Sequence, residues 1–259
     1  MKLKDTISII TGGGTGIGKA LAILLAEQGS TVIVCGRRVE PLNEVVKIIK
    51  EKGGQVLALS LDVSNWSQVK QMIDLILSKY GRIDIFVNNA GVAIAKSVIE
   101  TSEEEWDRIN DINLKATFLC SKAVLPFFIK NKKGIIINIS STLGQKAIPN
   151  YSAYCASKFG VIGFSQALAE EVRSGGIKVF IVCPAATKTD LHRQLVGEEI
   201  AKLAMPPEQV AKKIGDLITG KILLPSGGIL IIDNTRLIKK YCRKFKYLIN
   251  RIKKIIKSI

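Results

Sequence analysis

The sequence contains a single histidine, His192, and this scarcity excludes two classes of active site. With only one imidazole in the chain, we expect neither a serine–histidine–aspartate hydrolase nor a His-rich metal centre. The five cysteines are scattered and lack the paired spacing of a metal site, so we expect reduced thiols and no metal. No uninterrupted apolar run approaches the roughly 20 residues that span a bilayer, and no signal-like segment follows Met1. We therefore expect a cytoplasmic protein.

Acidic residues are absent from Arg236–Ile259, a stretch that carries ten Lys and Arg. The first 235 residues hold 28 basic and 22 acidic residues, so most of the net charge of +16 belongs to this tail. The chain is 47% hydrophobic and 23% charged, as is usual for globular proteins. We expect one folded domain over 1–235 and a separate basic segment over 236–259.

Apolar runs alternate with helical patterns along the first 235 residues. The predicted strands are Thr6–Ile10, Thr31–Cys35, Gln55–Leu61, Ile83–Val87, Gly134–Ile139, Ile177–Cys183 and Gly227–Ile232. The predicted helices are one that ends near Gly29, then Val39–Lys52, Asn65–Tyr80, Thr101–Ile129 with Pro126 interrupting it, Tyr151–Arg173, Leu191–Met205 and Pro206–Thr219. This alternation is typical of βαβ units in a parallel α/β sheet, whose ligands bind at the carboxyl ends of the strands.

A glycine-rich turn follows the first predicted strand and opens a helix. Such a turn lets the backbone approach a pyrophosphate, whose charge the helix N-terminus stabilises. The spacing is wider than the usual G-x-G-x-x-G, and by itself the turn could be only a tight strand-to-helix connection. The candidate coenzyme ligands here are Gly12, Gly14, Thr15, Gly16, Ile17 and Gly18.

The second predicted strand ends at Arg37 and Arg38, and no acidic residue lies between Glu27 and Glu40. In a dinucleotide site, an acidic side chain at this place binds the ribose hydroxyls, whereas arginine accommodates a 2′-phosphate. The pair therefore favours NADP(H) over NAD(H). For Arg38, a solvated basic turn is the alternative.

Tyr154 and Lys158 are four residues apart in a predicted helix and so share one face. A free tyrosine has a pKa of about 10, and a neighbouring ammonium would lower it toward the working range of an acid–base catalyst. Ser141, at the end of the fifth predicted strand, could bring a hydroxyl to the same point. A chance surface pair is the alternative for Tyr154 and Lys158 taken alone.

Taken together and in order, these motifs closely resemble the short-chain dehydrogenase/reductase family over residues 5–235. The residues that carry the resemblance are the glycine turn, Asn88–Gly91, Asn113, Ser141 and the Tyr154/Lys158 pair. The resemblance implies a Rossmann-type doubly wound, seven-stranded parallel sheet in the order 3-2-1-4-5-6-7, flanked by helices. It makes residues 1–235 a dinucleotide-binding catalytic domain.

The resemblance also implies a role for each matched residue. Tyr154 would protonate the carbonyl oxygen, Lys158 would lower its pKa and bond the nicotinamide ribose, and Ser141, rather than Ser140, would hold the substrate oxygen. Asn113 would fix a helix distortion and a water that relays protons. Further residues expected along the coenzyme cleft are Asp62, Val63, Asn89, Ala90, Gly91, Pro184, Thr187 and Thr189. One departure is Ala185, where family members commonly carry glycine.

In the segment 236–259, apolar residues recur at helical i, i+3, i+4 and i+7 steps between Lys and Arg. A basic amphipathic helix of this kind suits an anionic membrane surface, where each basic residue contributes about 1 kcal/mol. A protein interface is the second interpretation and nucleic acid the third, although no aromatic stacking platform or DNA-binding motif supports the last. We expect no nucleic-acid partner.

These observations predict an enzyme that interconverts a ketone and a secondary alcohol with NADP(H). The apolar residues in the segment Leu191–Met205 favour a hydrophobic carbonyl such as a 3-oxoacyl chain or another lipid ketone, while sugar, steroid and polyketide carbonyls stay open. The alternative is a non-catalytic, membrane-associated scaffold that binds a nucleotide. The family resemblance also implies a homodimer or homotetramer.

Overall fold

The computed structural model describes residues 2–233, so the predicted amphipathic helix 236–259 lies outside the described residues. Within residues 2–233 the strands form one parallel sheet in the order β3-β2-β1-β4-β5-β6-β7, which confirms the predicted Rossmann-type fold. The strands are β1 Ile7–Thr11, β2 Thr31–Gly36, β3 Val56–Ser60, β4 Ile85–Asn88, β5 Gly134–Ile139, β6 Ile177–Pro184 and β7 Ile229–Ile232. All lie within two residues of their predicted bounds.

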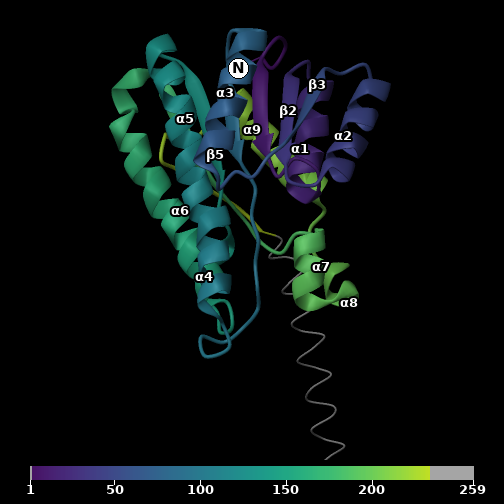
Figure 1. Ribbon diagram of the computed structural model, residues 1–259, viewed down its shortest axis with the longest axis vertical. Helices are drawn as coiled ribbons and strands as arrows, with labels where there is room; N and C mark the ends of the chain where they lie inside the picture. The colour runs from purple at the N-terminus through teal and green to yellow at the C-terminus, as the bar shows by residue number, and fades with distance from the viewer. Residues whose placement is uncertain (1, 234–259) are drawn as a thin grey trace, which may run out of the picture.

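Helices cover both faces of this sheet (Figure 1). They are α1 Gly16–Glu27, α2 Val39–Glu51, α3 Trp66–Tyr80, α4 Glu103–Asn110, α5 Ala116–Asn131, α6 Ser152–Glu171, α7 Asp190–Val196, α8 Glu198–Ala201 and α9 Pro207–Thr219, together with the short turns η1 Asp111–Lys115, η2 Thr142–Gly144 and η3 Arg173–Gly175. The single helix expected over 191–205 is thus two short helices, separated at Gly197, whose φ is +80°.

Two hydrophobic cores form because successive side chains of each strand point to opposite faces of the sheet. On one face, Ile10 and Val34 pack with residues of α1, α2 and α9. On the other face, Ile9 and Ile33 pack with residues of α3, α5 and α6. The inner strands β1, β2, β4, β5 and β6 are mostly buried on both sides, and their sequences are therefore rich in consecutive apolar residues.

The helix expected over Thr101–Ile129 is interrupted, but not by Pro126. Pro126 lies inside α5, and the break is the π-helix η1, which contains Asn113. Proline has no amide hydrogen to donate to the carbonyl of Lys122. Both Pro126 and Lys122 lie on the exposed side of α5, where solvent can reach that carbonyl. By length and composition alone, the stretch Glu103–Asn131 is apolar enough to cross a bilayer. Its inner face packs in the core of the fold, and this accounts for its apolar character.

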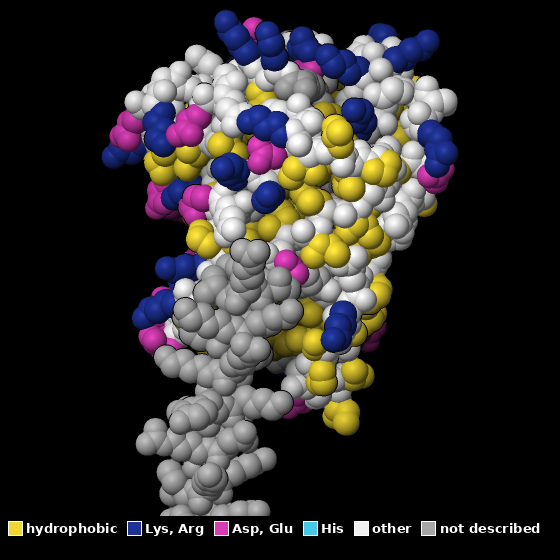
Figure 2. Space-filling view, turned by 180° about the vertical axis from the view of Figure 1, so that it is seen from behind, with side chains coloured by type: hydrophobic (Ala, Val, Ile, Leu, Met, Phe, Trp, Pro, Cys, Tyr) yellow, Lys and Arg dark blue, Asp and Glu magenta, His cyan; other side chains and the backbone are white. Residues whose placement is uncertain are grey.

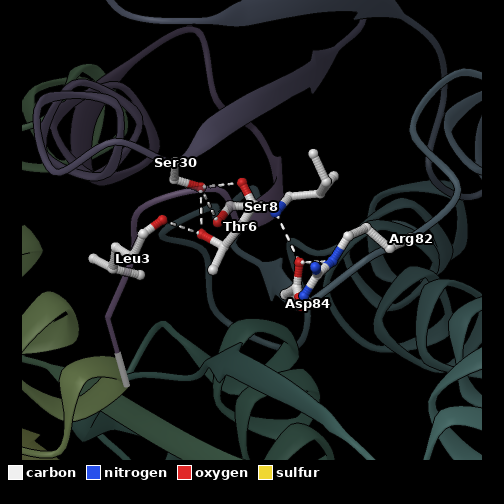
Figure 3. A network of polar contacts seen from close by, with 7 residues as sticks. Leu3, Thr6, Ser8, Ser30, Arg82 and Asp84 are labelled. Carbon is white, nitrogen blue, oxygen red and sulfur yellow. Dashed lines mark hydrogen bonds and ion pairs between the residues drawn. The ribbon is translucent and has the colours of Figure 1, made fainter.

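A buried polar network fastens the amino edge of the sheet (Figure 3). The Thr6 hydroxyl donates to the carbonyl of Leu3 at 2.6 Å, and the hydroxyls of Ser8 and Ser30 are 2.7 Å apart. Asp84 accepts a hydrogen bond from the amide of Ile7 at 2.9 Å and pairs with Arg82. These contacts join β1, β2 and β4 at the end of the sheet opposite the glycine turn, so they serve the fold rather than a site.

The opposite, carboxyl edge of the sheet carries the long connections. The β4–α4 loop and the helices α7 and α8 extend from this edge at the lower end of the molecule (Figure 1). The glycine turn after β1 and the Ser140/Ser141 pair after β5 lie at the same edge, since all seven strands run parallel. Ligand sites of open parallel sheets form at such an edge.

Candidate active site

The glycine turn is shaped by close contacts that leave no room for side chains. Gly12 has φ +62°, and a Cβ there would lie 2.9 Å from the Cα of Ala90. A Cβ on Gly18 would lie 2.3 Å from the carbonyl oxygen of Gly12. The amide of Asn89 donates to the carbonyls of Thr11 and Gly12 at 2.9 and 3.1 Å, so β4 holds the turn in place. The backbone at the start of α1 is thereby open to a pyrophosphate, as the sequence predicts.

A cavity of about 500 Å³ extends from this turn toward the ends of β2 and β3. Arg37, Arg38, Asp62 and Val63 line it, as predicted for the adenosine half of a coenzyme. Partial burial would raise the pKa of Asp62, but hydrogen bonds from the Ser64 hydroxyl and amide and the charge of Arg37 together lower it. Arg37 and Arg38 are exposed, so their guanidinium groups are free to approach a phosphate.

Some residues of this cavity were not predicted from the sequence: Pro41, Leu42, Arg108, Ile112, Arg193 and Gln194. Ile112 and Arg108 come from η1 and α4, on the far side of the cavity from the arginine pair. The sequence offered one signal for Ile112, namely that it immediately precedes the predicted site residue Asn113. Arg193 and Gln194 belong to α7, whose position over the cleft no local pattern reveals.

A second cavity of about 490 Å³ adjoins the first and shares its lining at Gly12, Thr15, Ala90 and Gly91. Its lining includes the other predicted site residues Gly16, Ile17, Asn89, Ser141, Tyr154, Lys158, Pro184, Thr187 and Thr189. Every predicted site residue therefore lines one of the two cavities, except Gly18 and Asn113. Those two are packed behind the surface.

Tyr154, Lys158 and Ser141 converge on one wall of this second cavity. The ammonium of Lys158 lies 5.8 Å from the centre of the Tyr154 ring and donates to the carbonyl of Ile139 at 2.9 Å. The hydroxyl of Ser140 donates instead to the carbonyl of Lys158 at 2.9 Å and is buried. Ser141, which forms a hydrogen bond with Tyr154, is thus the serine positioned at the phenol, and this agrees with the expectation from the family resemblance.

The pKa values of this group differ from the expectation. Burial raises the pKa of Tyr154 to about 12, and a hydrogen bond with Ser141 opposes that rise. Burial also lowers the pKa of Lys158 to about 8. The expected lowering of the pKa of Tyr154 by Lys158 is therefore not found, because desolvation of the phenol by burial is the largest influence on its pKa. The phenol keeps its proton at neutral pH.

Asn113 is buried in η1 and acts through its amide group. Its Oδ1 accepts from the amide of Val92 at 2.8 Å, and its Nδ2 donates to the carbonyl of Val92 and the hydroxyl of Ser157, both at 2.9 Å. It therefore ties the β4–α4 loop to α6 one turn behind Tyr154. The predicted helix distortion is present at this residue. Ser157, which completes the contact, was not predicted.

Polar residues beneath the cleft continue this connection. Asn88 donates to Asn138 at 2.8 Å, and Asn138 donates to Ser165 at 2.7 Å. These buried side chains link β4, β5 and α6. Because an unpaired buried amide is costly, the chain fixes the position of α6, and with it Tyr154 and Lys158, relative to the sheet.

The opposite wall of the second cavity is mostly apolar and comes partly from α7. Of the six apolar residues that the sequence offered as a cover for the substrate, Leu191, Leu195 and Val196 line the cavity. Ile200 and Leu203 are exposed, and Met205 is buried in the core. Residues of this cavity that the sequence did not predict include Leu143, Ile148, Tyr151 and His192.

Metal chemistry has no support from the arrangement of residues 2–233, because no three His, Cys, Asp or Glu side chains within this range are grouped to hold a metal ion. The described cysteines, Cys35, Cys120, Cys155 and Cys183, are buried and free.

Comparison with known proteins shows one family. Residues 6–199 match the short chain dehydrogenase family. A 3-oxoacyl-[acyl-carrier-protein] reductase of Thermotoga maritima is 35% identical over 246 residues, which cover 89% of this chain and 100% of that protein. Cyclopentanol dehydrogenase of a Comamonas species is 34% identical over 242 residues, which cover 90% and 97% of the two chains.

Solved structures of the same kind superpose over most of the chain. Levodione reductase matches with a TM-score of 0.85 at 27% identity, covering 91% of this chain and 98% of its own. A 3-ketoacyl-(acyl-carrier-protein) reductase from Brucella melitensis, complexed with NADH, matches with a TM-score of 0.83 at 27% identity, covering 91% and 99%.

Proposed function

The chain belongs to the short-chain dehydrogenase/reductase family, and on that premise we propose that it is an NADP(H)-dependent oxidoreductase that interconverts a ketone and a secondary alcohol. The observation that carries the proposal is the meeting of Tyr154, Ser141 and Lys158 on the wall of a cavity that adjoins the glycine turn. A phenol, a hydroxyl and an ammonium at one point can hold and protonate a carbonyl oxygen.

The residues present fit a nicotinamide dinucleotide. The turn at Gly12 and Gly18 has space only for backbone, which is the cradle a pyrophosphate needs. Arg37 and Arg38 would receive a 2′-phosphate, and Asn89, Thr187 and Thr189 would line the nicotinamide half. When bound, the coenzyme supplies the hydride for the carbonyl carbon. Because a similar protein is known with NADH, the preference for NADP(H) rests on the two arginines.

The chain's own residues would supply the proton. The hydroxyl of Ser141 would hold the substrate oxygen beside Tyr154, whose phenol is protonated at neutral pH and would donate its proton to that oxygen. As the proton leaves, the charge of Lys158 stabilises the phenolate that forms. A positioned general acid of this kind contributes about 10²- to 10⁴-fold to a rate.

The substrate we propose is a hydrophobic carbonyl compound such as a 3-oxoacyl chain or another lipid ketone. Ile139, Leu143 and Ile148 on one side of the second cavity and Leu195 and Val196 on the other give it an apolar lining. Several similar proteins are named 3-oxoacyl-[acyl-carrier-protein] reductases, which supports this class.

The test is NADPH oxidation with a panel of ketones, comparing the native chain with Tyr154→Phe. The variant should lose about 10²-fold or more in kcat/KM while binding NADPH normally. Tyr151→Phe is the matched control, since Tyr151 is a second phenol that lines the same cavity but is not the proposed proton donor, and it should keep most of the activity. If all three proteins, the native chain included, bind NADPH but none of them reduces any ketone, the non-catalytic scaffold is favoured.

For the segment 236–259, we propose contact with an anionic membrane surface at the cytoplasmic face, on the strength of its ten Lys and Arg and no acidic residue. Equal flotation on anionic vesicles with and without 236–259 would reject this.

We also propose a homodimer or homotetramer, supported by the exposed aromatic side chains Phe118 and Phe159 on α5 and α6. Sedimentation equilibrium tests this.

A further inference from the structure

Five large aliphatic side chains are exposed on connections at the carboxyl edge of the sheet. Val98 and Ile99 in the β4–α4 loop are 72% and 98% exposed, and Ile148 in the segment before α6 is 41% exposed. Ile200 in α8 and Leu203 just after it are 57% and 49% exposed. We call these five residues the apolar rim. Figure 2 shows hydrophobic side chains reaching the lower tip of the molecule, where these connections extend.

The apolar rim is connected to the second cavity through the segments that carry it. Ile148 belongs both to the rim and to the cavity lining. The backbone bridge between Lys96 and Tyr151 joins the loop that carries Val98 and Ile99 to the cavity-lining segment. On the other side, Leu195 and Val196 of α7 line the cavity, and Ile200 follows in α8. Rim residues therefore lie on segments that adjoin the cavity lining on both of these connections.

The chain leaves the described structure at this same edge. β7 runs parallel to the other strands, so Asp233, the residue after its end, lies at the carboxyl edge. Residues 234–259 follow, and Arg236–Ile259 bring ten Lys and Arg with no acidic residue. An apolar rim and a strongly basic segment that starts at the same edge are the two features by which a protein binds an anionic bilayer.

The charges around the rim indicate which feature gives apolar contact with a membrane and which gives electrostatic attraction. Glu198 and Glu199 of α8 are paired with Arg193 and Lys202, so they leave little net charge beside Ile200. Across the entrance, the first turn of α4 is acidic. In Figure 2, many Lys and Arg side chains lie along the upper edge of the molecule, and a few lie lower on its sides. The rim itself therefore offers apolar contact, and the attraction to anionic lipid comes from residues 236–259.

A second copy of the chain would also cover an apolar rim, but charge disfavours it. A symmetric contact would bring the same edge of both copies together, and with it two segments of ten uncompensated basic residues each. Such like charges repel across a shared interface, whereas an anionic membrane attracts both.

We propose that the apolar rim rests in the interfacial layer of an anionic bilayer, so that the entrance of the second cavity faces the membrane and a hydrophobic ketone enters from the lipid. This inference rests on the proposed function for the identity of the substrate. The docking itself does not depend on turnover, and the two are therefore measured separately.

The test uses the full chain and vesicles of phosphatidylcholine containing one third phosphatidylglycerol. Ile99→Asp should weaken vesicle binding about tenfold, because an aliphatic side chain leaves the interfacial layer and an acidic one faces anionic lipid. Ile99 is 98% exposed, so the fold should tolerate the change. Leu203→Asp, on the other side of the entrance, repeats the test independently and should act in the same direction.

Leu223→Asp is the matched control. Leu223 is 89% exposed and lies between α9 and β7, at the amino edge of the sheet, so its substitution removes a similar exposed aliphatic side chain at the far end of the molecule. Vesicle binding by this variant should equal that of the native chain. If Ile99→Asp and Leu223→Asp bind vesicles equally, the proposal is wrong. A fall in oligomer mass with Ile99→Asp, at unchanged vesicle binding, would assign the rim to a second copy instead.

Turnover separates this inference from the proposed function. With a short, water-soluble ketone, native chain and Ile99→Asp should have equal kcat/KM, whereas a long-chain ketone presented in vesicles should be reduced several-fold more slowly by the variant. Absence of turnover with either ketone would reject the proposed function and leave the binding comparison to decide the rim. Equal rates with the vesicle-bound ketone would reject entry from the lipid.

Discussion

The two cavities of the cleft are built by different physical means. The glycine turn that joins them allows no side chain at Gly12 or Gly18. A Cβ at these positions would lie 2.9 and 2.3 Å from neighbouring backbone atoms, so only glycine fits. The far wall of the second cavity is set by aliphatic side chains such as Leu191, Leu195 and Val196, which other apolar residues could replace. The first region specifies residue identity, and the second specifies only apolar character.

From this difference we expect the glycine turn to select its ligand strictly and the far wall to select weakly. A site whose backbone geometry is fixed accepts one ligand class, here a pyrophosphate-containing coenzyme. A wall of interchangeable aliphatic groups discriminates weakly among hydrophobic ligands, since one methylene contributes only about 1–3 kcal/mol. We therefore expect substitutions in the glycine turn to act on binding as a whole, and those on the far wall to shift substrate preference.

Gly18→Ala should have the largest effect on coenzyme binding, and it tests the steric argument for the glycine turn directly. The added Cβ meets the Gly12 carbonyl oxygen and the Asn89 amide, and neither is the end of a long flexible side chain. We expect the affinity for NADPH to fall about a hundredfold, equivalent to about 3 kcal/mol, measured by fluorescence titration. Gly163→Ala in α6 is the control: nothing lies within 4 Å of its new Cβ, so stability should rise by about 0.5–1 kcal/mol with unchanged affinity. Equal affinities of the two variants would contradict the steric argument.

Asn113→Ala would test the connection between the β4–α4 loop and α6. The change leaves the amide of Val92 and the hydroxyl of Ser157 without their buried partner. The free energy of unfolding in urea should fall by roughly 2–4 kcal/mol. Asn110→Ala, three residues earlier, removes only a bond to the carbonyl of Trp106 near solvent and should cost no more than about 0.5 kcal/mol. A similar loss in both variants would show that the amide of Asn113 is not special.

Lys158→Met would test the cost of the buried ammonium through its pH dependence. The folded-state pKa of Lys158 is lowered from 10.5 to about 8, so between these values the unfolded chain holds more protons and stability rises with pH. The methionine variant lacks this contribution. The free energy of unfolding of the native chain, relative to the variant, should therefore increase by up to about 3 kcal/mol from pH 7 to pH 10.5. Urea denaturation across this range measures it, and a difference that stays constant with pH would refute the burial argument.

Arg37→Asp should give the smallest effect, because Arg37 is exposed and solvent screens its charge. The native chain should bind NADPH more tightly than NADH, and the ratio of the two Kd values should shrink about tenfold in the variant. Arg173→Asp, which makes the same charge change just after α6, should leave the ratio unchanged. A native preference for NADH would overturn the coenzyme assignment.

Local sequence patterns predicted much of the fold and the glycine turn of the site. Runs such as Gly134–Ile139 are buried on both faces, so their continuous apolar character marked strands directly. Proline misled the interpretation of the helix over 101–129, because its effect depends on which side faces water: Pro126 is exposed within α5 and costs little. The π-helix around Asn113 followed from the family resemblance, not from periodicity.

The far wall of the second cavity and the pKa values of the site were harder to predict from the sequence. Leu191, Leu195 and Val196 were expected over the substrate, but Met205, in the same segment, proved to be a core residue. The pKa of Tyr154 was expected to fall and instead rises to about 12. In both cases the outcome depends on how deeply a side chain is buried by distant segments, which spacing along the chain does not report.

The sequence by itself determined the parallel α/β sheet, the glycine turn, and the presence of a phenol and an ammonium on one helix face. Those features depend on residue type and on separations of a few positions, which the chain carries locally. Only the tertiary structure decided that Ser157 secures Asn113, that burial raises the pKa of Tyr154, and that exposed aliphatic side chains form an apolar rim. Hydrogen-bond distance, desolvation and exposure arise only when segments far apart in the sequence pack together.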